Sequence, residues 1–188
     1  MKKTTNPYSD HEIREQIRNF YTDLAAKRAL PRERIQVLVV DDEPQSLYTF
    51  QRLLQRDFDI YIANSAREGF AILKNSNIHV IISDQRMPEM TGIDFFKTIL
   101  PVYKDPIRIL LTGYTDLEAA IDSINEGEVY RYISKPFQKP QMQQLIKDAY
   151  ELYYLRKKTA KLTKDLATTN RQLEFIIREQ LLDSEAFA

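Results

Sequence analysis

Acidic, hydroxyl and basic residues follow four apolar segments of this sequence, and together they have the groups needed to phosphorylate a carboxylate. The residues that end or follow these segments are Asp41, Asp42, Asp84, Thr112 and Lys135. Carboxylates can hold a hard divalent cation or act as nucleophiles, and a hydroxyl and an ammonium can stabilise a phosphoryl group. This chemistry requires that residues distant in the sequence meet at one point.

The apolar segments have the length and composition of buried β-strands. They cover residues 35–40, 78–83, 107–111 and 129–133, and residues 58–63 form a shorter candidate. Helical patterns alternate with them, at residues 44–55, 65–74, 93–100, 116–125 and from 141 onward. This alternation predicts an α/β fold with a doubly wound, five-stranded parallel sheet in the order 2-1-3-4-5. The carboxyl ends of such strands lie at one edge of the sheet, where these folds bind ligands.

Asp41 and Asp42 are adjacent at the end of a buried strand. Their charges repel each other there unless a cation offsets the repulsion. An all-oxygen cluster suits Mg²⁺, which keeps several waters and takes one or two carboxylates. The alternative is that these acids only solvate a loop.

Asp84 is the candidate nucleophile, since a carboxylate can form an aspartyl phosphate. Thr112 would donate a hydrogen bond to a phosphoryl oxygen, and Lys135 would place its ammonium against the same group. Thr112 could instead cap a strand, and Lys135 could be a surface cation. Four such residues after four successive core strands favour the phosphoryl interpretation.

The composition limits the class of protein. The chain has 188 residues, 43% hydrophobic and 29% charged, with a formal net charge of zero and no cysteine. Disulfides and thiolate metal sites are therefore excluded, and the charge gives no support for direct binding to nucleic acid. No segment approaches the roughly 18 apolar residues of a membrane span, so we expect a cytoplasmic protein.

Two helical extensions flank the domain predicted for residues 35–150. Residues 1–34 contain an amphipathic pattern after Ser9, which predicts a helix that packs on its own domain or on the far helix, or serves as a separate recognition helix. Residues 141–188 contain neither glycine nor proline, which permits one helix of about 70 Å. We expect residues 151–188 to form a stalk continuous with the last helix of the domain.

The long helix carries a heptad seam with polar interruptions. Its positions are Leu145, Asp148, Leu152, Leu155, Thr159, Leu162, Leu166, Thr169, Leu173, Ile176 and Gln180. A polar helix of this length is marginal alone. We expect a parallel dimeric coiled coil, with folding back on the same chain as the alternative.

Residues 35–150 resemble the receiver domain of two-component response regulators, which has a flavodoxin-like fold. The matching motifs are Val39-Val40-Asp41-Asp42-Glu43, Ser83-Asp84-Gln85-Arg86-Met87-Pro88-Glu89-Met90-Thr91-Gly92, Leu111-Thr112-Gly113-Tyr114 and Ser134-Lys135-Pro136-Phe137. Their order and spacing agree with the family over about 60% of the chain.

The resemblance implies specific roles for these residues. Asp84 would accept a phosphoryl group from a sensor histidine kinase, and Thr112 and Lys135 would contact that group. Asp42, Asp84 and the backbone carbonyl of Arg86 would bind Mg²⁺, with Asp41 acting through water. The Lys135-Pro136 bond would be cis.

The resemblance also implies a switch and an output. Tyr132 falls at the aromatic switch position and would turn inward when Thr112 is drawn to the phosphoryl group, although it could simply be a half-buried strand residue. The altered surface would change the pairing of two receivers and act on a partner or a downstream output module. Bulky residues at Arg86 and Tyr114 predict slow self-dephosphorylation.

Two other functions compete with this interpretation. A haloacid-dehalogenase-like phosphohydrolase also uses a strand-end aspartate, a threonine and a lysine with Mg²⁺. It requires a second acid two residues after its nucleophile, where this sequence has Arg86 after Asp84 and Glu43 after Asp41. The other alternative is a phosphate-independent scaffold that uses only the coiled coil. We therefore expect no enzymatic turnover beyond the phosphorylation and dephosphorylation of the chain itself.

Overall fold

The computed structural model describes residues 34–113 and 128–186 of the chain. The predicted N-terminal helix, the predicted helix at 116–125 and Tyr114 lie outside the described residues. The described part contains a five-stranded sheet in the order β2-β1-β3-β4-β5, and every neighbouring pair is parallel. Its strands are β1 (Gln36–Val40), β2 (Asp59–Ala63), β3 (Val80–Asp84), β4 (Ile107–Thr112) and β5 (Val129–Ser134). The predicted fold class and strand order are confirmed.

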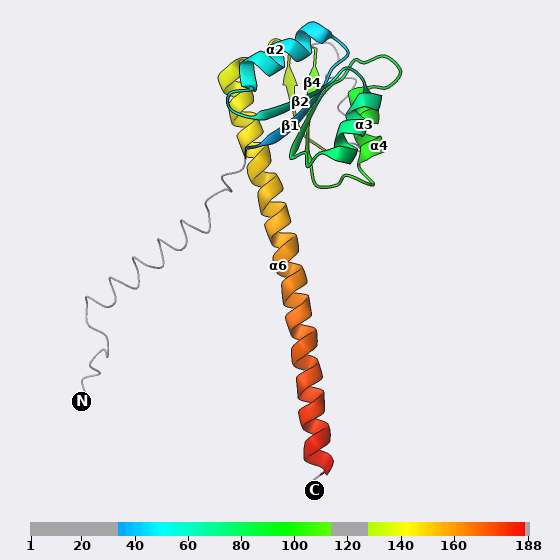
Figure 1. Cartoon of the computed structure of the whole chain (residues 1–188), viewed down its shortest axis with the longest axis vertical. Helices are drawn as coiled ribbons and strands as arrows, with labels where there is room; N and C mark the ends of the chain where they lie inside the picture. Colours follow the sequence, from blue (N-terminus) through cyan, green and yellow to red (C-terminus); the bar gives the residue numbers. More distant parts are fainter. Residues whose placement is uncertain (1–33, 114–127, 187–188) are drawn as a thin grey trace, which may run out of the picture. The chain divides into compact units, whose positions relative to one another are not determined.

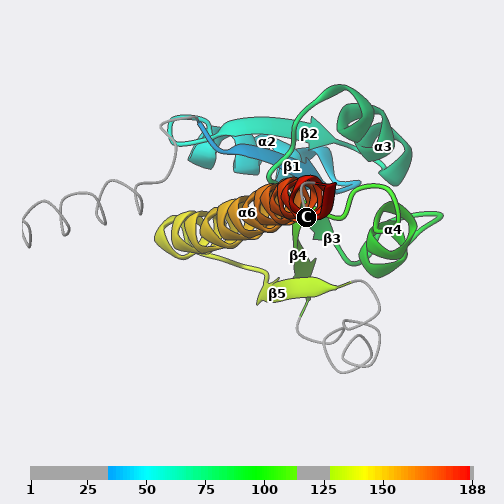
Figure 2. The same cartoon turned by 90° about the horizontal axis from the view of Figure 1, so that it is seen from below.

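Helices cover both faces of this sheet (Figures 1 and 2). They are α2 (Pro44–Leu54), α3 (Ala66–Asn75), α4 (Gly92–Ile99) and α6 (Lys139–Ala186). One hydrophobic cluster joins α2 and α6 to one face, through residues such as Phe50, Val39 and Ile146. A second cluster joins α3 and α4 to the other face, through Leu73, Phe95 and Leu110. Burial on both faces explains why the central strands β1, β3 and β4 are almost continuously apolar.

Local signals set where the shorter helices begin. Pro44 occupies the first turn of α2, where its missing N–H is not needed. The Ser65 side chain accepts a hydrogen bond from Glu68 N at 3.3 Å at the start of α3. Thr91 accepts from Asp94 N at 3.2 Å at the start of α4. Each of these caps lies where the loop after a strand meets its helix. The cap therefore fixes the end of that loop at the acidic edge.

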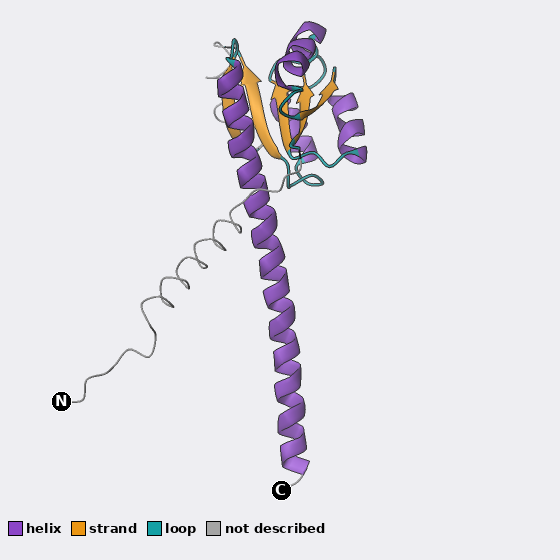
Figure 3. Cartoon of the chain, turned by 60° about the vertical axis from the view of Figure 1, so that its left-hand side comes forward, coloured by secondary structure: helices purple, strands orange, loops and turns teal. Residues whose placement is uncertain are grey.

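The long helix α6 has a buried part and an exposed part (Figure 3). Its buried residues are Met142, Leu145, Ile146, Ala149, Tyr150 and Tyr153. From Leu155 the described side chains are exposed except that of Lys158, which is partly buried, and Leu162 and Leu166 are 59% and 63% exposed. The predicted seam therefore serves two purposes: Leu145 and Leu152 pack in the domain core, and only the residues from Leu155 onward are available to a partner.

Candidate functional site

A lysine joins two aspartates at the carboxyl edge of the sheet. Lys135 Nζ lies 2.8 Å from Asp41 Oδ2 and 2.6 Å from Asp84 Oδ1. Asp41 follows β1, Asp84 ends β3 and Lys135 follows β5, so three separated strands position the cluster. The structure thus brings together these three residues, as the sequence predicts. Both aspartates are buried, at 1% and 8% exposed.

The charges in this cluster do not balance. Burial raises the pKa of Asp84, and this effect outweighs the hydrogen bond from Lys135, while the charge of Asp41 raises the pKa further. The pKa of Lys135 is also raised: its own burial lowers it, but the hydrogen bonds and charges of Asp41 and Asp84 outweigh that effect. A single ammonium shared by two carboxylates explains both directions. The cluster retains surplus negative charge and favours a further cation.

Two groups besides the lysine hold the Asp41 side chain. Its Oδ1 accepts a hydrogen bond from Glu43 N at 2.9 Å, and its Oδ2 accepts one from Ser46 Oγ at 2.6 Å. The sequence motifs do not include Ser46, which lies in the first turn of α2, the helix that follows Asp41. A hydroxyl near the start of a helix that follows an acidic pair is the signal that could have indicated it.

Asp42 and Arg86 complete the predicted metal ligands. Asp42 is exposed beside the cluster, and Arg86 N donates to Asp84 Oδ2 at 2.9 Å. Within residues 34–113 and 128–186, no three acidic or histidine side chains already stand close enough to form an ion site. The Lys135 ammonium lies between Asp41 and Asp84, where it offsets charge that a metal would otherwise offset. The available donors are carboxylate and carbonyl oxygens, which fit Mg²⁺.

Thr112 lies beside the cluster but makes a different contact. It is buried at the end of β4, and its hydroxyl donates to the carbonyl of Gly113 at 3.0 Å. Its own carbonyl accepts from Lys135 N at 3.0 Å, which couples Thr112 to the backbone of the lysine. The Lys135-Pro136 bond is cis, as predicted.

The loop between β3 and α4 folds closely against Asp84. Gly92 N donates to Gln85 O at 3.1 Å, and a Cβ at Gly92 would lie 2.3 Å from the Asp84 carbonyl oxygen. Only glycine fits this close backbone approach. The motif includes Gly92, but its steric role depends on tertiary structure and cannot be predicted from its spacing.

Tyr132 is 51% exposed on β5. It lines an open groove of about 410 Å³ between β5 and α6, together with Leu145 and Asp148. In this structure the tyrosine is on the surface, which is the outward position that the predicted switch requires before its inward turn.

Comparison with known proteins identifies the same region of the chain. Residues 37–147 match the family model of the response regulator receiver domain. The hydrogenase transcriptional regulatory protein HoxA of Bradyrhizobium diazoefficiens is 34% identical over 141 residues, which cover 75% of this chain and 29% of that protein. HoxA of Cupriavidus necator is 33% identical over 150 residues, 80% of this chain and 31% of that protein. The chain thus spans less than a third of these relatives.

Solved structures of similar proteins support the same family. A response regulator receiver domain protein from Clostridium thermocellum is 32% identical with a TM-score of 0.60, covering 64% of this chain and 98% of that one. An adenylate cyclase structure from Rhodopirellula baltica is 32% identical with a TM-score of 0.66, covering 70% of this chain and 98% of that one.

No helix in the described ranges has the length and apolarity of a membrane span. Three observations indicate the same family: the parallel sheet, the acidic edge with its lysine, and the family match over more than half of the sequence. The chain belongs to the family of response regulator receiver domains.

Proposed function

We propose that this chain is a phosphorylation-dependent signalling switch in which Asp84 accepts a phosphoryl group from a sensor histidine kinase. The main support is the buried pair of carboxylates that share Lys135, because their surplus negative charge favours a cation and then an incoming phosphoryl group. No turnover of another substrate is assigned to the site.

Mg²⁺ would be held by Asp42, Asp84 and the backbone carbonyl of Arg86, with Asp41 acting through water. When bound, the ion would screen the repulsion between the carboxylate and the phosphoryl oxygens. Asp41 is well suited to a supporting role because Ser46 and Lys135 already bind its Oδ2.

In the transfer, a carboxylate oxygen of Asp84 forms a bond to phosphorus. The bond from phosphorus to the donor breaks, and its electron pair stays with the leaving imidazole or carboxylate. Lys135 already contacts Asp84, so its ammonium can follow the new charge onto a phosphoryl oxygen. The Thr112 hydroxyl would give up its hydrogen bond to the Gly113 carbonyl and donate a hydrogen bond to another phosphoryl oxygen.

The movement of Thr112 would vacate space that Tyr132 enters from the surface. The change would remodel the groove beside α6 and, through this helix, the pairing of two chains. Parallel pairing is favoured because each seam residue then meets its own copy, so Leu162 and Leu166 meet leucines and Thr169 meets threonine. The antiparallel register that aligns Leu155 with Gln180 would set Leu166 against Thr169. A downstream output module would receive this change.

The test is incubation with acetyl phosphate and Mg²⁺, followed by intact-mass and peptide analysis. We expect one phosphoryl group on Asp84, released by hydroxylamine as an acyl phosphate is. A group on a different residue, or uptake that is equal with a chelator present, would refute the assignment.

Arg86 should prolong the lifetime of this phosphoryl group. The exposed side chain lies two residues beyond Asp84, and its backbone is fixed by the bond from Arg86 N to Asp84 Oδ2 at 2.9 Å. There it can narrow the approach of the attacking water. We expect Arg86→Asn to shorten the half-life several-fold, measured by loss of label after the donor is removed. An unchanged half-life would show that Arg86 does not shield the group.

A further inference from the structure

The zero net charge of the chain conceals a strongly basic segment in α6. Residues 156–171 contain six lysines and arginines and a single acidic residue, Asp165, which gives a net charge of +5. Residues 172–188 contain four acidic residues and one arginine, which gives −3. The basic segment begins where α6 stops being buried, just after Tyr153. Such local asymmetry points to an anionic partner.

The basic residues are arranged as a stripe along one face of the helix. Ile146, Tyr150 and Tyr153 face the domain core, and the same steps of three and four residues continue outside it. The residues that continue this face are Lys157, Lys161, Lys164, Thr168, Arg171 and Phe175. From Lys157 to Arg171 the stripe is about 21 Å long. It lies on the side of α6 opposite to the leucine seam, so pairing through the seam would leave it accessible.

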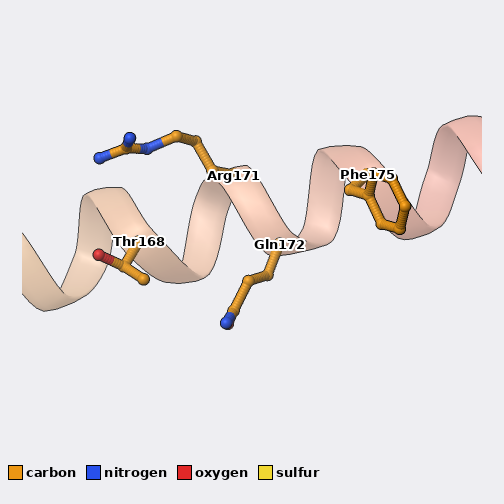
Figure 4. A pocket seen from close by; sticks show the side chains of 4 residues that line it. All are labelled: Thr168, Arg171, Gln172 and Phe175. Carbon is orange, nitrogen blue, oxygen red and sulfur yellow. The ribbon is translucent and has the colours of Figure 1, made fainter.

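The stripe is exposed, and most of its charge is uncompensated. Lys157 forms an ion pair with Asp105 at the edge of the domain. Lys161 and Lys164 are exposed and form no ion pair with any residue of the described part of the chain. Arg171 donates through Nε to the Ala167 carbonyl at 3.3 Å, and Figure 4 shows its guanidinium lying along the outside of the helix toward Thr168. Thr168 and Phe175 occupy the neighbouring turns.

We propose that this stripe binds the phosphate backbone of double-stranded nucleic acid without reading its sequence. Lysine is depleted in protein–protein interfaces, whereas nucleic-acid interfaces are polar and strongly positive, so the stripe resembles the latter. An interfacial membrane helix buries the apolar face that lies opposite its basic face. Here that opposite face is the leucine seam, which pairing of two chains would cover. Single strands require aromatic stacking platforms, and Phe175 is the one aromatic residue of the stripe.

The experiment measures the fluorescence anisotropy of a labelled, random-sequence DNA duplex titrated with the full chain at several salt concentrations. No phosphodonor is present, so failure here leaves the assignment of Asp84 untouched. If about four phosphates are contacted, the logarithm of the association constant should fall with the logarithm of salt concentration with a slope of about −4. The combined change Lys161→Glu, Lys164→Glu and Arg171→Glu should weaken binding at least tenfold.

A matched control changes net charge equally on the domain surface: Arg56→Glu, Arg67→Glu and Lys74→Glu, all at exposed positions. This control variant should bind the duplex much more tightly than the stripe variant. A second control, Lys161→Arg with Lys164→Arg, should bind like the parent. Circular dichroism of each variant should show that α6 is retained. Equal weakening in both charge-reversed variants would overturn the proposal. So would a parent chain that binds polyglutamate or phosphatidylserine vesicles but not the duplex.

Discussion

Replacing Asp84 with asparagine should reduce phosphoryl uptake from acetyl phosphate by at least about a hundredfold, to the background of the method. An amide oxygen is a poor nucleophile. The substitution also removes one of the charges that would hold Mg²⁺. Lys135 would remain bound to Asp41 at 2.8 Å, so the lysine alone would not restore uptake. The measurement is the phosphoryl stoichiometry by intact mass.

The same substitution should raise the melting temperature at neutral pH. Burial raises the pKa of Asp84 in the folded chain above its usual value of 3.8. An acid with a raised folded pKa binds its proton more tightly in the folded state, so its ionisation costs stability as pH rises through that pKa. The gain from Asp84→Asn should therefore be largest above the folded pKa, decrease as the pH falls through that pKa, and disappear below the usual value of 3.8.

Asp57→Asn is the matched control, because it makes the same chemical change at an exposed position. The side chain of Asp57 pairs with Lys139 at 3.3 Å and accepts a hydrogen bond from Gln143. We expect unchanged phosphoryl uptake in this variant. If Asp57→Asn lowered uptake as much as Asp84→Asn, the effect would not belong to the proposed site.

Replacing Gly92 with alanine should destabilise the domain by about 3 kcal/mol, among the larger effects of a single substitution. The new Cβ would lie 2.3 Å from the Asp84 carbonyl oxygen and 2.9 Å from Leu110 Cδ1. The first contact is with backbone, so relief requires movement of the loop that holds Asp84. Denaturant unfolding gives the loss of stability, and we expect Mg²⁺ affinity to fall as well.

Gly69→Ala provides the comparison for this prediction. Its Cβ would lie 3.0 Å from Phe95 Cζ and 3.3 Å from Val40 Cγ2, which are side-chain atoms. We expect a smaller loss of stability, with Mg²⁺ affinity close to that of the parent. Equal losses in the two variants would show that contact with the Asp84 backbone is not what makes Gly92 necessary.

The sequence predicts the sheet and its acidic edge because apolar strands that alternate with helices admit few arrangements. Once the order is fixed, Asp41, Asp84 and Lys135 must lie near one another. The contact of Gly92 was not predictable, since it depends on how a loop packs against Asp84. A hydroxyl near the start of the following helix is a signal for Ser46, but the packing of the helix turn decides that it reaches Asp41. The sequence also does not show where the exposed part of the heptad seam begins. Leu145 and Leu155 follow the same helical spacing, and the position where the sheet ends decides which of them is buried.

We expect phosphorylation of Asp84 to alter the pairing of two α6 helices. The chain contains no cysteine, so Ala160→Cys gives one spin label on each exposed helix. We would measure the distance between labels with and without Mg²⁺ and beryllofluoride, which mimics the phosphoryl group. Leu162→Asp with Leu166→Asp should abolish the signal, and Asp84→Asn should remove its response. We expect a shifted distance distribution in the parent when the mimic binds. Identical distributions in paired chains with the mimic bound would show that Asp84 does not control the pairing.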